Sequence, residues 1–90
     1  MKRRVLLAED HPGTIEVMQQ ELEVLGYEVS VAQNGLEAVE KASAEPSDLI
    51  VMDMIMPKMD GFQAAVWIRQ NPKTQNIPIL AATALVRPGG

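Results

Sequence analysis

The ninety residues are enough for one small domain, and their composition, 47% hydrophobic and 22% charged, is that of an ordinary soluble globular protein. The absence of cysteine excludes disulfides and thiolate metal sites, and the formal net charge of −4 argues against a nucleic-acid-binding surface. No apolar run approaches the length of a membrane span or of a signal peptide. We therefore expect a cytoplasmic domain that binds neither nucleic acid nor membrane.

The first predicted strand is residues 5–8, a continuous apolar run typical of a strand buried on both faces of a parallel sheet. Two acids, Glu9 and Asp10, follow it directly. Pro12 then begins a predicted helix, which ends at Gly26. Apolar residues at helical spacing predict the buried face of this helix: Ile15, Met18, Leu22 and Leu25.

Residues 27–32 alternate between polar and apolar side chains, which predicts a half-exposed strand at the edge of the sheet. Asn34, with Glu37 three positions later, predicts the N-cap and capping box of a second helix. This helix is expected to end before Pro46. Its predicted buried residues are Leu36, Val39 and Ala42.

Residues 49–52 form a third apolar run and predict a second strand buried on both faces, with Asp53 where the run stops. Pro57 then turns the chain. Asp60, with Gln63 three positions later, predicts the N-cap of a third helix. The predicted buried residues of this helix are Phe62, Ala65, Val66 and Ile68.

A fourth apolar run, residues 79–82, predicts a last strand that ends at Thr83. The order βαβαβαβ requires a parallel sheet with right-handed crossovers, so the predicted fold class is α/β. The last strand has the pattern of an interior strand, yet the residues after it form no further predicted element. Because an uncovered apolar edge promotes association, we expect that another chain or segment completes the sheet, with self-association through this fourth strand as one possibility, or that the ninety residues are a fragment of a larger domain.

Three acids stand at the carboxyl ends of the two buried strands: Glu9, Asp10 and Asp53. Open parallel sheets bind ligands beyond those ends. Carboxylates gathered there would repel one another unless a cation joined them, and oxygen ligands suit Mg²⁺. A carboxylate can also attack phosphorus and form an acyl phosphate.

Two other features have simpler explanations than a ligand site. The lone His11 is expected to be a solvated loop residue. The methionines at positions 52, 54, 56 and 59 could suggest a soft copper site, but adaptable packing is the interpretation we adopt.

The sequence resembles the receiver domain of two-component response regulators. The resemblance is carried by Glu9-Asp10, Asp53, residues 56–61 (Met-Pro-Lys-Met-Asp-Gly) and residues 82–84 (Ala-Thr-Ala). It implies a flavodoxin-like, doubly wound parallel sheet with strand order 2-1-3-4-5. We expect the first four of these strands, in the order 2-1-3-4, without the fifth. Residues 1–90 would then form the N-terminal four-strand portion of a receiver domain.

The resemblance also implies a role for each acid. Asp53 would accept a phosphoryl group from the phosphohistidine of a sensor histidine kinase or phosphotransfer protein. Asp10 and Asp53 would bind Mg²⁺ directly, and Glu9 would assist through a water molecule. The backbone carbonyl of Ile55 would supply a further oxygen ligand.

Thr83 and Ala84 occupy the phosphoryl-binding and switch positions of the family, where the Thr83 hydroxyl would donate to a phosphoryl oxygen. The family pattern continues through a fourth helix, a fifth strand ending in a phosphoryl-pairing lysine, and a fifth helix, none of which is present in the ninety residues. We therefore assign no catalytic lysine. Lys58 is not taken as a substitute, because its loop position points outward in the family.

The leading functional hypothesis is a Mg²⁺-dependent phosphoacceptor module of a phosphorelay, which catalyses its own phosphorylation and turns over no metabolite. The first alternative is a non-phosphorylatable interaction module that assembles through its open sheet edge. A second alternative is a phosphohydrolase with Asp53 as nucleophile. That class needs a second acid two residues after the nucleophile, and this chain has Ile55 there.

Overall fold

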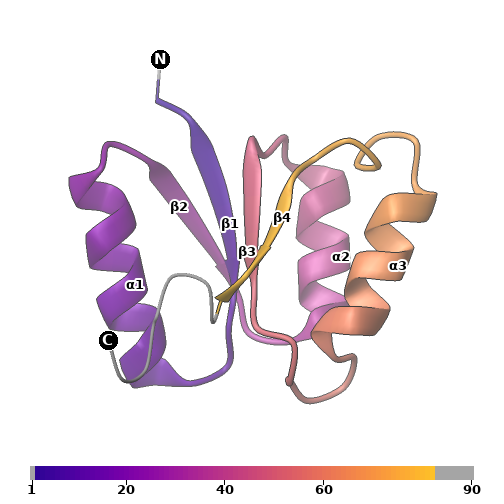
Figure 1. Ribbon diagram of the computed structural model, residues 1–90, viewed down its shortest axis with the longest axis horizontal. Helices are drawn as coiled ribbons and strands as arrows, with labels where there is room; N and C mark the ends of the chain where they lie inside the picture. The colour runs from indigo at the N-terminus through magenta and orange to yellow at the C-terminus, as the bar shows by residue number, and fades with distance from the viewer. Residues whose placement is uncertain (1, 83–90) are drawn as a thin grey trace.

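The computed structural model describes residues 2–82, which form seven elements in the predicted order (Figure 1). The strands are β1 (Arg4–Ala8), β2 (Glu28–Ala32), β3 (Leu49–Met52) and β4 (Ile79–Ala81). The helices are α1 (Pro12–Val24), α2 (Gly35–Ala44) and α3 (Gly61–Gln70). No helix in this part of the chain is long and apolar enough to cross a membrane.

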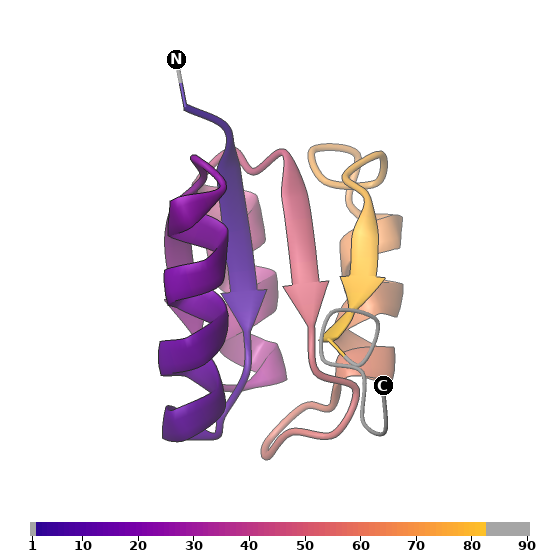
Figure 2. The same cartoon turned by 60° about the vertical axis from the view of Figure 1, so that its left-hand side comes forward.

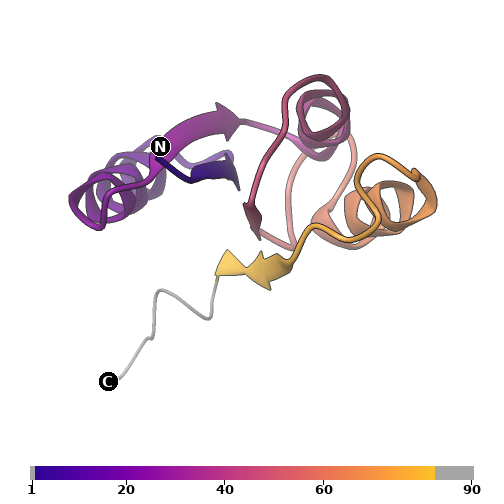
Figure 3. The same ribbon diagram turned by 90° about the horizontal axis from the view of Figure 1, so that it is seen from above.

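All strands are parallel and lie in the order β2-β1-β3-β4, which confirms the predicted α/β topology. In Figure 2 the arrows of β1, β3 and β4 point in the same direction. Helix α1 lies on one face of the sheet, and α2 and α3 lie on the other (Figure 3). Ala8 of β1 is paired with Met52 of β3, so the next residue of each strand, Glu9 and Asp53, leaves the sheet at the same place.

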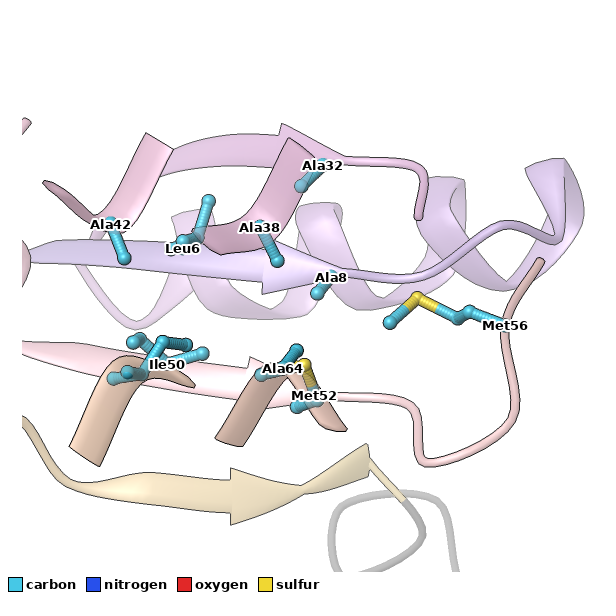
Figure 4. Close-up of a cluster of buried hydrophobic side chains, with 10 residues drawn as sticks. Leu6, Ala8, Ala32, Ala38, Ala42, Ile50, Met52, Met56 and Ala64 are labelled. Atoms are coloured by element: carbon cyan, nitrogen blue, oxygen red, sulfur yellow. The ribbon is translucent and has the colours of Figure 1, made fainter. Parts of the chain in front are cut away.

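Each central strand is buried on both faces because its side chains alternate between two apolar clusters. In β1, Val5 and Leu7 join the α1 cluster, whereas Leu6 and Ala8 join the α2–α3 cluster (Figure 4). The α1 cluster is completed by Met18, Leu22, Val51 and Ala82. The α2–α3 cluster is completed by Ala32, Ala38, Ala42, Ile50, Met52, Met56, Ala64 and Ile68. This double burial fixes the two strands that carry the acids.

The predicted helix caps of α2 and α3 are confirmed. Asn34 accepts a hydrogen bond from the Glu37 N–H at 2.8 Å, and the Glu37 carboxylate accepts one from the Gln33 N–H at 3.0 Å. Asp60 accepts from the Gln63 N–H at 2.9 Å. The bonds from the Glu37 and Gln63 N–H groups satisfy backbone donors that the first turn of a helix leaves without partners.

His11 is exposed, as expected of a solvated loop residue, but it also has a structural role that was not predicted. His11 is the N-cap of α1, and its Nδ1 accepts from the Thr14 N–H at 3.3 Å. The signal was present in the sequence, because proline favours the first helical position and Pro12 therefore places the cap one residue earlier.

Four side chains that the sequence pattern assigned to helix interiors are largely exposed. They are Leu25 (73% exposed), Leu36 (46%), Phe62 (67%) and Val66 (54%). In α2 and α3 the buried positions belong mostly to small residues, which let the helices approach the sheet closely and turn the larger apolar side chains outward. Leu25 is the C-cap of α1, where the chain already leaves the helix toward Gly26.

Leu22 and Leu25 offer a matched test of the assigned core, because both are leucines at the end of α1 and only Leu22 is buried. We expect Leu22→Ala to lower the free energy of unfolding by about 2–5 kcal/mol through lost burial and a cavity. We expect Leu25→Ala to change it by less than about 0.5 kcal/mol. Urea unfolding followed by circular dichroism measures both, and equal losses would contradict the burial pattern.

Candidate functional site

Three carboxylates meet at the carboxyl end of the sheet. The Glu9 N–H donates to the Ala32 carbonyl at 2.9 Å, and the Asp53 N–H donates to the Ala8 carbonyl at 2.9 Å. These bonds extend the strand ladders by one residue and fix the backbone of both acids. As a result, one carboxylate oxygen each from Glu9, Asp10 and Asp53 lies within 4.8 Å of the others. The structure thus brings together the acids that the sequence placed at separate strand ends.

Glu9 is the buried member of this cluster, with 5% of its surface exposed. Its Oε2 accepts hydrogen bonds from the Asp10 N–H at 3.0 Å and the His11 N–H at 3.1 Å. Burial raises the pKa of Glu9 above its ordinary value of 4.5, and the neighbouring Asp53 carboxylate raises it further, against the opposing effect of the two backbone donors. The raised pKa shows that these hydrogen bonds do not fully offset the cost of ionising Glu9.

Asp53 is half-buried and Asp10 is exposed, so the cluster is open to solvent on one side. The Asp53 Oδ1 accepts a hydrogen bond from the Ile55 N–H at 3.1 Å, a contact that fixes one oxygen of this carboxylate. The Ile55 side chain is 82% exposed. That the Ile55 backbone carbonyl binds a metal ion stays a prediction.

Helix α3 begins directly against the backbone of Asp53. A Cβ on Gly61 would lie 2.4 Å from the Asp53 carbonyl oxygen, so only glycine fits at this first helical position. The Gly61 N–H donates to the Met54 carbonyl at 3.0 Å and joins the two ends of the loop between β3 and α3. Met56 extends from this loop toward the strand ends and is 8% exposed (Figure 4), as expected of a packing residue.

The remaining predicted positions contribute less to the described site. Thr83 and Ala84 lie outside the described residues 2–82. Lys58 is exposed and adopts a left-handed backbone conformation with φ 67°. Within residues 2–82 the ion pairs are Arg4–Glu28 and Lys41–Glu37, neither of which involves the acid cluster.

The donor set fits a hard divalent cation. It offers carboxylate oxygens from three residues and one open side, which suits Mg²⁺ because this ion keeps several waters and accepts one or two carboxylates.

The family model of the response regulator receiver domain matches residues 5–87. The chain belongs to this family. It is 32% identical over 89 residues to the polar-differentiation response regulator DivK of Brucella anthropi, covering 99% of this chain and 72% of DivK. It is also 45% identical over 84 residues to the hybrid signal transduction protein dokA of Dictyostelium discoideum, covering 92% of this chain and only 5% of dokA.

Solved receiver structures share the fold. The receiver domain of the sensor histidine kinase PA1611 from Pseudomonas aeruginosa aligns with a TM-score of 0.89 and 35% identity over 99% of this chain and 73% of that chain. That structure holds a magnesium ion in its active-site cleft. The chemotaxis response regulator CheY4 of Vibrio cholerae aligns with a TM-score of 0.86 and 32% identity over 90% of this chain and 68% of that chain. The flavodoxin-like receiver fold is therefore confirmed.

The raised pKa of Glu9 predicts how stability depends on pH when no metal is bound. The folded protein holds the Glu9 proton more tightly than the unfolded chain, so this group stabilises the fold below about pH 4.5, and that contribution is lost as pH rises through the folded pKa. We expect Glu9→Gln to raise the urea midpoint relative to wild type in EDTA at pH 7, and the gain to shrink toward pH 4.

The exposed Glu16 of α1 provides the control, because Glu16→Gln removes the same charge away from the acid cluster. Two results would contradict the assigned cost of ionising Glu9. One is an increase in the urea midpoint of Glu9→Gln that stays constant between pH 4 and pH 7, and the other is an increase equal to that of Glu16→Gln.

Proposed function

We propose that this receiver domain is a Mg²⁺-dependent phosphoacceptor of a two-component phosphorelay, with Asp53 as the phosphorylated residue. The observation that carries the proposal is the approach of a half-buried, solvent-accessible Asp53 carboxylate to within 4.8 Å of two further acids at the end of a rigid sheet. Membership of the receiver family supports it. The domain acts as a signalling module of the cytoplasm and turns over no metabolite.

The donor in this proposal is the phosphohistidine of a sensor histidine kinase or phosphotransfer protein. A carboxylate oxygen of Asp53 attacks phosphorus, the new O–P bond forms, the P–N bond breaks, and the imidazole leaves as the neutral base after taking up a proton. The Ile55 N–H holds Oδ1 of Asp53, and we assign the attack on phosphorus to Oδ2. Positioning by the fixed backbone of Asp53 lowers the entropic part of the barrier.

The proposed metal ligands are Asp10 and Asp53 directly, Glu9 through water, and the Ile55 backbone carbonyl. When bound, Mg²⁺ neutralises charge on the carboxylates and on the phosphoryl oxygens. The oxygen-only donor set supports this assignment, as does the magnesium ion of the similar PA1611 receiver domain. Family resemblance assigns phosphoryl binding to the Thr83 hydroxyl and the switch to residues 83 and 84.

One observation favours assembly as a second candidate function. Among residues 2–82, β4 has a strand neighbour on one side only, β3, and its three residues are half-exposed. An edge of this kind can add a strand from another chain. We propose self-association through the edge of β4 that faces away from β3. Asp53 follows β3 on the other side of β4, so pairing at this edge is compatible with phosphorylation at Asp53.

The phosphoacceptor is tested with a small acyl phosphate or phosphoramidate donor and Mg²⁺. We expect wild type to gain the mass of one phosphoryl group, in an adduct that is stable in acid and labile in base, as an acyl phosphate is. Asp53→Asn should gain none, because an amide is a poor nucleophile toward phosphorus. Intact-protein mass spectrometry measures both.

Asp60→Asn is the matched control, since it makes the same substitution in the same loop and asparagine keeps the N-cap of α3. It should be labelled like wild type. Labelling that persisted in Asp53→Asn would refute the assignment, and a wild type that takes up no phosphoryl group would favour the assembly function.

Self-association is tested by sedimentation equilibrium of the ninety-residue chain. We expect dimers or larger species at micromolar concentration, and a shift toward monomer in Leu80→Lys, because a charge on an edge strand disfavours pairing. The control Val24→Lys places the same charge on the exposed end of α1 and should leave the association unchanged. A wild type that sediments as a monomer would exclude this function.

A further inference from the structure

The first residue of α2 touches the loop that follows Asp53. A Cβ built on Gly35 would lie 1.8 Å from the Met59 carbonyl oxygen and 2.5 Å from its carbonyl carbon. Real Cβ atoms do not approach backbone atoms this closely, so any other residue at position 35 must move either α2 or the loop. Helices α2 and α3 also share one buried apolar cluster, to which α2 contributes Ala38 and Ala42, and this packing limits how far α2 can retreat.

The loop cannot absorb such a shift at Met59 alone. The Met59 N–H donates to the Pro57 carbonyl at 2.8 Å, and the Gly61 N–H closes the loop on the Met54 carbonyl at 3.0 Å. Lys58, which lies between Pro57 and Met59, already adopts a left-handed backbone conformation that most residues avoid. A displacement of Met59 is therefore transmitted along a short, closed loop whose first half includes Ile55, the residue that holds the Asp53 carboxylate.

The same helix start is fixed to the other half of the acid cluster. Ala32, at the end of β2, accepts the hydrogen bond from the Glu9 N–H. The next residue, Gln33, donates to the Glu37 side chain, and Asn34 caps α2. The turn at residues 33–35 thus connects the strand end that holds Glu9 with the loop that holds Asp53.

We propose that Gly35 is a positioning residue for the acid cluster: the absence of its side chain lets the loop after β3 seat against α2 and holds Ile55 and Asp53 in the geometry that binds Mg²⁺. This inference rests on the proposed Mg²⁺ site. Gly35 itself contacts neither metal nor phosphoryl group in this proposal, and its effect passes through the Met59 carbonyl and the loop.

The test compares the dissociation constant of Mg²⁺ alone, measured by isothermal titration calorimetry, with stability measured by urea unfolding. We expect Gly35→Ala to weaken Mg²⁺ binding at least tenfold and to shift the amide signals of Ile55 and Asp53 in NMR spectra of the metal-free protein. Gly13→Ala is the matched control, because it lies in the first turn of α1 and its Cβ would meet only the His11 ring, at 3.3 Å. It should keep the wild-type affinity within twofold.

Leu22→Ala distinguishes an effect on the position of the acids from an effect on stability. It destabilises the fold by removing a side chain of the α1 cluster, which contains no residue of the loop after β3. It should unfold at lower urea but bind Mg²⁺ within twofold of wild type. If Gly35→Ala does not fold, Asn34→Ala takes its place, since it loosens the same turn by removing the cap of α2 and should weaken Mg²⁺ binding about threefold.

Wild-type affinity in folded Gly35→Ala, or in folded Asn34→Ala where that variant is used, would overturn the positioning role while leaving the Mg²⁺ site intact. A loss of affinity in Leu22→Ala equal to that in Gly35→Ala would also overturn it, because the effect would then follow stability. A wild type that binds no Mg²⁺ would refute the proposed metal site itself.

Discussion

The fold must hold three mutually repelling carboxylates together at the carboxyl end of its sheet. Two like charges less than 5 Å apart repel by an energy on the order of 3 kcal/mol when the effective dielectric constant is about 20. Glu9 and Asp53 lie within this range, and Glu9 is also buried. The fold must therefore hold the two acids together without help from a cationic side chain, since none of residues 2–82 forms an ion pair with them.

The parallel sheet provides that restraint through its central strands. β1 and β3 are buried on both faces, and the backbone N–H groups of Glu9 and Asp53 each extend a strand ladder into the next residue. Separating the acids would break these hydrogen bonds and expose the apolar ends of both clusters. Apolar burial thus stabilises an arrangement that electrostatics alone would disperse.

The elements and the convergence of the acids could be predicted from the sequence because both depend on local signals. Continuous apolar runs marked the buried strands, and Asn34 and Asp60 marked two helix starts through bonds that span three residues. Parallel topology then required the strand ends to share one edge. The family motif assigned roles that geometry alone does not, and those of Thr83 and Ala84 fall outside the described residues.

The helix faces could not be predicted in the same way, because periodicity does not show which of two adjacent stripes faces the sheet. In α3 the pattern favoured Phe62, Ala65, Val66 and Ile68, and of these the structure buries Ile68 alone, together with Gly61 and Ala64. The same close packing explains why the contacts of Gly35 and Gly61 with the loop were missed. A glycine in a sequence indicates conformational freedom, but the backbone that approaches it is visible only in three dimensions.

These observations suggest a division between the parts of the site that are rigid and the part that can respond to a ligand. The acids on β1 and β3 are fixed by strand ladders and double burial, whereas the loop after Asp53 is fixed mainly by its own closing bond, by Met56 and by two glycine contacts. Neutralising the cluster would remove the repulsion without altering the strands. Any structural response is then expected in the loop, whose Ile55 N–H already contacts the Asp53 carboxylate, because it is the least constrained neighbour of the changing charge.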